Sequence, residues 1–141
     1  MRKIDELFGR YDASHRNATN KAIHWICVPL IVWSVLAVLW VWTPLAAYAL
    51  IALAVVYYVS ISLPIAIGML VVSLAMVLVL MAIPDHLLIV AGVVFVAAWI
   101  GQFIGHKIEG KKPSFFEDLT FLMIGPAWLL GFLYRRFGIP Y

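Results

Sequence analysis

The sequence predicts an all-α protein, a polytopic bundle of membrane helices, and three observations support this fold class. Of its 141 residues, 65% are hydrophobic and only 12% are charged, whereas soluble domains carry about 25% charged residues. Four apolar runs approach the roughly 20 residues that a helix needs to cross a bilayer. Proline marks the break between each run and the next. The length allows one domain over residues 1–141.

The first predicted element is a short amphipathic helix at the N-terminus. Ile4, Leu7, Phe8 and Tyr11 follow the i, i+3, i+4, i+7 spacing of one helix face, and charged residues lie elsewhere around it. We expect this helix to lie on the membrane surface as a simple anchor.

Four transmembrane helices are expected next, over residues 22–42, 44–63, 65–83 and 87–104. A fifth apolar stretch, residues 119–134, is shorter and is interrupted by Gly125-Pro126. Stretches below the spanning length are often re-entrant or interfacial, so we expect this C-terminal segment not to cross the membrane.

The positions of the basic residues predict which side of the membrane each end occupies. All ten Lys and Arg residues lie within residues 2–21 and 107–112 or at positions 135 and 136, and the turns between spans contain none. Four spans put all of them on one side, which is expected to be cytoplasmic along with both termini. The membrane is expected to be a bacterial inner membrane or that of the endoplasmic reticulum. The net charge of +3 then indicates contact with anionic membrane lipid rather than nucleic acid.

Sidedness also sorts the four histidines. His24 opens the first span and His106 follows the fourth, so both are expected at the same membrane surface as His15. His86 lies between the third and fourth spans, about 30 Å away. Nine helical residues turn the chain through about 900°, so one continuous helix would set His15 and His24 on opposite sides. We therefore predict a break between them, with Asn17 or Thr19 as the N-cap of the next helix.

Three imidazoles at one depth suit a site for Fe, Zn, Cu or Ni. Asn20 lies one turn before His24, while Gln102, His106 and Glu109 share a face of another helix. The amides of Asn20 and Gln102 are expected to orient the imidazoles by hydrogen bonds. Glu109 is either a ligand or a solvated residue, and solvation is slightly favoured. Taken singly, each histidine is more often an interfacial residue than a ligand.

Two further lysines, Lys111 and Lys112, follow this helix. They are most simply signals of topology, and they are also candidates for attracting the carboxylate of an amphiphilic substrate.

Two motifs resemble those of the Mpo1-like family. Residues 11–29 read YDASHRNATNKAIHWICVP, with H-x4-N-x3-H and a following Pro, and residues 99–119 read WIGQFIGHKIEGKKPSFFEDL, with Q-x2-G-H. The resemblance covers essentially the whole chain, although between the motifs only the hydropathy matches. It implies an Fe(II)-dependent dioxygenase, an oxidoreductase that uses O2 to remove one carbon from 2-hydroxy fatty acids in fatty-acid α-oxidation.

The same resemblance maps the family's histidines onto His15, His24 and His106 as the catalytic metal ligands, and His86 belongs to neither motif. Two other functions stay open. One is a non-catalytic membrane scaffold or lipid-binding protein, in which the histidines only anchor and hydrogen-bond. The other is a zinc-dependent membrane hydrolase, because three imidazoles and a water also form a catalytic zinc pattern. A transporter is disfavoured because the interiors of the expected spans contain no Asp, Glu, Lys or Arg.

Overall fold

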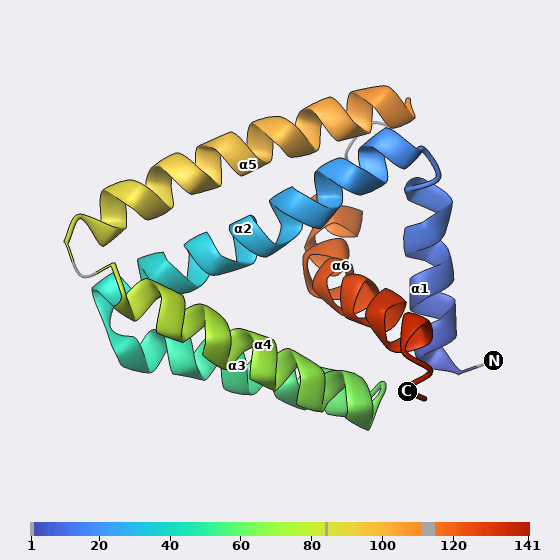
Figure 1. The fold of residues 1–141 in the computed structure, drawn as a ribbon, viewed down its shortest axis with the longest axis horizontal. Coiled ribbons are helices and arrows are strands. Elements are labelled where there is room, and N and C mark those ends of the chain that lie inside the picture. Colours follow the sequence, from blue (N-terminus) through green and yellow to red (C-terminus); the bar gives the residue numbers. More distant parts are fainter. Residues whose placement is uncertain (1, 84, 111–114) are drawn as a thin grey trace.

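The structure is a computed structural model that describes residues 2–83, 85–110 and 115–141, with only the backbone described for residues 14 and 115–122. These residues form six α-helices and no strand, which confirms the all-α class (Figure 1). The helices are α1 (Lys3–Ser14), α2 (Ala18–Trp42), α3 (Pro44–Val59), α4 (Leu63–Met81), α5 (Leu87–Glu109) and α6 (Phe115–Arg136).

Three of the four expected spans have the length and composition to cross a membrane, namely α2, α4 and α5. The other, α3, has 16 residues, or about 24 Å, which is less than the hydrocarbon thickness of about 30 Å. It is shorter than expected because the chain turns at Ser60–Ser62 before α4 begins. The chain passes back and forth four times, so α2 begins and α5 ends at the same end of the bundle (Figure 1).

Helices α2 and α5 lie side by side and antiparallel, and glycine lets them approach closely (Figure 1). A Cβ atom added at Gly101 would lie 2.5 Å from Cys27 Sγ, and one at Gly105 would lie 2.3 Å from Asn20 Oδ1. A side chain at either position would force its neighbour to shift, and small residues four apart allow such close contact in packed membrane helices. This contact brings the residues around His24 and His106 together.

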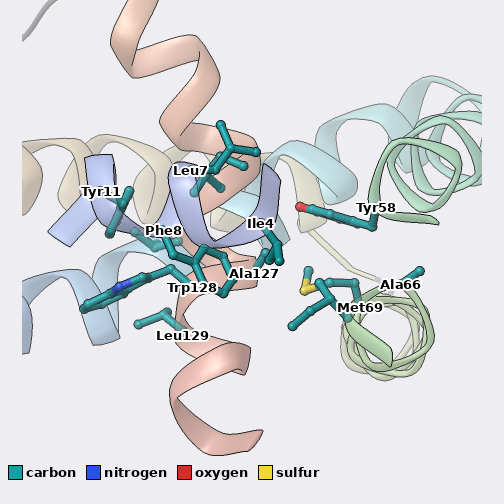
Figure 2. Close-up of a cluster of buried hydrophobic side chains, with 13 residues drawn as sticks. Ile4, Leu7, Phe8, Tyr11, Tyr58, Ala66, Met69, Ala127, Trp128 and Leu129 are labelled. Atoms are coloured by element: carbon teal, nitrogen blue, oxygen red, sulfur yellow. The ribbon is translucent and has the colours of Figure 1, made fainter. Parts of the chain in front are cut away.

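The predicted amphipathic helix is confirmed as α1, but the expectation that its apolar face rests on the membrane surface is wrong. Ile4, Leu7, Phe8 and Tyr11 are at most 9% exposed, and they pack against α6 (Figure 2). Periodicity shows that a face is apolar but does not show what covers it. Here α6 supplies the cover, with a strip that includes Ala127, Trp128 and Leu129.

Helix α6 continues through Gly125-Pro126, where the sequence had suggested an interruption. Membrane helices tolerate an internal proline when neighbouring groups satisfy the freed backbone. Three residues before Pro126, the Tyr58 hydroxyl of α3 donates a hydrogen bond to the carbonyl oxygen of Met123 at 2.6 Å and ties this part of α6 to α3. Together α1 and α6 run across the end of the bundle where α2 begins and α5 ends (Figure 1).

Candidate metal centre

His15 lies in a short break between two helices, as the sequence predicted. Helix α1 ends at Ser14 and α2 begins at Ala18, which confirms the break. Asn17 is the N-cap, because its side-chain oxygen accepts hydrogen bonds from the backbone N–H groups of Thr19 at 2.9 Å and Asn20 at 3.2 Å. The change of direction turns the His15 ring toward α2, where a continuous helix would have pointed it away.

Three histidines from three segments gather at this end of the bundle, and we call His15, His24 and His106 the imidazole cluster. The ring centres of His15 and His24 are 4.3 Å apart. That of His106 lies 5.9 Å from His24 and 6.4 Å from His15. His15 and His24 are buried, with 1% and 2% exposed surface. His86 caps the opposite end of α5, about 30 Å along that helix from His106.

The hydrogen bonds of His15 and His24 define which ring nitrogen carries the proton. His15 Nδ1 lies 2.7 Å from the carbonyl oxygen of Tyr11, and His24 Nδ1 lies 2.9 Å from that of Asn20. A carbonyl oxygen only accepts, so each Nδ1–H donates and each Nε2 presents a lone pair. The two Nε2 atoms are 3.0 Å apart. Two lone pairs that face each other repel unless a cation or a proton lies between them.

Burial argues against a proton in that position. It lowers the pKa of His15, because an imidazolium loses its hydration in a buried site. A metal ion is the alternative, and the distances allow a direct test of fit. Two nitrogens that bind one ion at about 2.1 Å and about 90° lie about 3.0 Å apart, whereas a tetrahedral angle separates them by about 3.4 Å. The separation between the two Nε2 atoms, 3.0 Å, matches the right-angled arrangement.

The third imidazole is also within reach of a shared ion. A ring centre lies about 3.3 Å from a metal that its nitrogen binds, so two rings on one ion have centres at most about 6.6 Å apart. All three separations in the imidazole cluster are below this limit. Within the described residues, no group of three His, Cys, Asp or Glu side chains is placed to hold a metal ion as it stands. A shared ion would therefore require the His106 ring to turn toward the other two.

Glu109 has contacts that the sequence did not suggest. Its Oε1 accepts hydrogen bonds from the backbone N–H of Asn17 at 3.0 Å and from Asn20 Nδ2 at 3.1 Å. This carboxylate thus ties the last turn of α5 to the first turn of α2. A negative charge is favourable there because the N-terminus of a helix carries a partial positive charge.

The amides of Asn20 and Gln102 do not orient His15 or His24, since the backbone carbonyls of Tyr11 and Asn20 do so. Both side chains are buried, with 0% and 6% exposed surface. Asn20 Oδ1 and Gln102 Oε1 have no hydrogen-bond partner among the described residues. Buried acceptors without partners are rare and costly, so these two oxygens are unusual features beside the imidazole cluster.

The sequence analysis did not assign two aromatic residues to the site. The Tyr11 ring stacks on His15 with centres 4.0 Å apart and planes 9° apart, and Trp128 of α6 lies 5.0 Å from Tyr11. Trp128 Nε1–H donates to Asp12 Oδ1 at 2.7 Å. Burial raises the pKa of Tyr11, so its hydroxyl stays protonated. Tyr11 lies one turn before His15, which was a usable signal, but the Trp128 contact joins distant segments. Lys111 and Lys112 lie outside the described residues.

Comparison with known proteins identifies one family. The sequence model described as "2-hydroxy-palmitic acid dioxygenase Mpo1-like" matches residues 1–137. No curated protein and no solved structure matches the chain. The match includes the whole of all six helices and the segments that supply the three clustered histidines. The chain therefore belongs to the Mpo1-like family.

Proposed function

We propose that this protein is an Fe(II)-dependent dioxygenase that acts on 2-hydroxy fatty acids. The substrate R–CH(OH)–COOH and O2 would give the acid R–COOH, CO2 and water, which balances atoms and electrons and removes one carbon. The family description supports the reaction class. One observation supports a bound metal ion. The Nε2 lone pairs of buried His15 and His24 face each other at 3.0 Å, and the His106 imidazole is within reach.

His15, His24 and His106 are the proposed ligands. Iron, when bound, supplies the activation of O2 that no amino-acid side chain provides. The family description names a dioxygenase, which supports iron over zinc. That description is our reason for preferring the dioxygenase to a zinc hydrolase.

Other residues of this chain would position the ligands and exclude water. Glu109 and Asn20 hold the ends of α2 and α5 together. The Tyr11 ring covers one face of His15, and Trp128 holds α1 in place through Asp12. A closed, dry site strengthens electrostatic contacts with the substrate carboxylate and protects reactive species from water.

The site is proposed to face the cytoplasm at the membrane surface. The eight Lys and Arg residues in the described part of the chain fall in segments at the end of the bundle that holds the imidazole cluster, and basic residues are retained on the cytoplasmic side. Such a position would admit an amphiphilic acid from the lipid. Lys111 and Lys112 remain proposed contacts for its carboxylate on sequence grounds.

The test is elemental analysis of protein purified without oxygen, followed by oxygen uptake with 2-hydroxypalmitic acid and quantification of the shortened acid. We expect about one iron per chain. His24→Ala and His106→Ala should each abolish iron binding and turnover, while His86→Ala, at the far end of α5, should leave both unchanged.

Three results would overturn the proposal. Turnover in a metal-stripped preparation would exclude an iron mechanism. Stoichiometric zinc with hydrolytic activity would support the hydrolase. Absence of any metal, with the histidine variants affecting only stability, would support a non-catalytic scaffold.

A further inference from the structure

An apolar cavity of about 380 Å³ lies among helices α2 to α6. Its walls include Ile31 and Val35 of α2, Ala54 of α3, and Phe95 and Trp99 of α5. A methylene group occupies roughly the volume of a water molecule in the liquid, about 30 Å³. The cavity thus has room for about a dozen methylenes.

The cavity follows the same two helix faces that carry the imidazole cluster. On α2, Ile31 and Val35 lie seven and eleven residues after His24, and on α5, Trp99 and Phe95 lie seven and eleven residues before His106. Steps of seven and eleven residues return to nearly the same side of a helix. The nearest lining residues are therefore about 10 Å along each helix from the imidazoles.

Unpaired polar groups occupy the space between the imidazole cluster and the cavity. Gln102 lies one turn from His106 on this face, is 6% exposed, and has a buried Oε1 without a partner among the described residues. Trp99 lines the cavity, and its buried Nε1 also has no partner there. Of the two, the Gln102 acceptor lies nearer the imidazole cluster, and it suits a ligand that carries a hydroxyl.

We propose that this cavity holds the acyl chain of the 2-hydroxy acid and that its size sets the chain length the protein prefers. The polar end of the ligand lies toward the imidazole cluster, with its hydroxyl donating to Gln102 Oε1. The identity of this polar end rests on the proposed function, whereas the fit of the acyl chain rests on the cavity.

The experiment is equilibrium dialysis of saturated 2-hydroxy acids, from hexanoic to tetradecanoic, against the purified full chain in detergent without oxygen. Oxygen is excluded so that binding is measured without turnover, and protein-free detergent gives the blank. Each added methylene should tighten binding about fourfold until the cavity is full. Beyond that length the affinity should stop rising.

Two alanines of α3 provide a matched pair of variants. Ala54→Phe places a ring in the cavity and should lower the chain length at which affinity stops rising by a few carbons. Ala52→Phe adds the same ring at an exposed position of the same helix and should leave the profile unchanged. Circular dichroism and thermal unfolding would verify that both variants fold.

A second variant tests the polar end if Ala54→Phe fails to fold. Gln102→Leu keeps the side-chain size but removes the acceptor. It should reduce the preference for 2-hydroxy acids over unsubstituted acids by up to about tenfold, without moving the chain length at which affinity stops rising.

The inference is overturned if affinity does not depend on chain length, or if Ala54→Phe and Ala52→Phe give the same profile. A co-purified phospholipid that 2-hydroxy acids cannot displace would also overturn it. Failure of the proposed function looks different. In that case the chain-length profile and its response to Ala54→Phe persist, but iron and oxygen uptake are absent.

Discussion

Gly105→Ala would test whether the close approach of α2 and α5 sets the geometry of the imidazole cluster. The added Cβ would lie 2.3 Å from Asn20 Oδ1 and 3.4 Å from His24 Cε1, while real Cβ contacts essentially never fall below 3.0 Å. Asn20 cannot simply rotate away, because its Nδ2 is bonded to Glu109. Either Asn20 must give up its bond to Glu109 or the helices must move apart, by about 0.7 Å, and overpacking of this kind costs about 1–3 kcal/mol.

The matched control is Gly92→Ala on the same helix, where an added Cβ meets nothing within 4 Å. Both variants gain up to about 1 kcal/mol in helix propensity. The difference between their free energies of unfolding thus isolates the clash, and we expect Gly105→Ala to be the less stable by about 1–3 kcal/mol. Unfolding would be followed by circular dichroism as SDS is added to protein in mixed micelles.

The same variant should also impair the site, because displacements near 1 Å at a reacting centre cost on the order of a hundredfold in rate. Iron content and oxygen uptake would be measured on both glycine variants. If Gly105→Ala matched Gly92→Ala in stability, iron content and turnover, the contact between α2 and α5 would not be what positions the histidines.

Three further predictions concern the contacts around the imidazole cluster. Trp128→Phe removes the donor to Asp12 and should weaken the packing of α1 on the bundle by about 1 kcal/mol. Proteolysis at the α1–α2 break should then be faster, and equal rates in variant and wild type would contradict this. Glu109→Gln keeps an acceptor for Asn17, so its iron affinity should stay within a few-fold of wild type. Glu109→Ala should weaken iron binding by about 10–100-fold. Metal titration would measure both affinities, and equal losses in the two variants would indicate that Glu109 is itself a ligand. Asn17→Ala should lower the free energy of unfolding by about 1 kcal/mol through loss of the N-cap, and Asn17→Asp should restore it in the same SDS titration.

Local patterns were sufficient to predict much of the fold. The break after Ser14 and the Asn17 cap followed from helix geometry and side-chain chemistry, which act over a few residues. The packing of α6 on the apolar face of α1 could not be predicted in this way, because an apolar face fits lipid and another helix equally well. The continuity of α6 at Pro126 was also not predicted, since a proline can end a helix or lie within one, and packing against other helices decides between the two.

The candidate site shows the same division. The shared depth of His15, His24 and His106 followed from span counting, and the ring separations agree with it. The tie from Glu109 to Asn17 joins residues 92 positions apart. No spacing rule reaches that far, because such contacts depend on how the helices pack rather than on one helix face.

The cover of α1 by α6 has a consequence for biogenesis. Helix α1 is synthesised before the other described helices and α6 after them, yet their apolar faces bury each other. His15 follows directly from α1 and stacks on Tyr11 of that helix. The contact between α1 and α6 cannot form while α2 to α5 are being translated. Until α6 is made, the nascent chain therefore carries His15 and the apolar face of α1 without the cover that α6 provides.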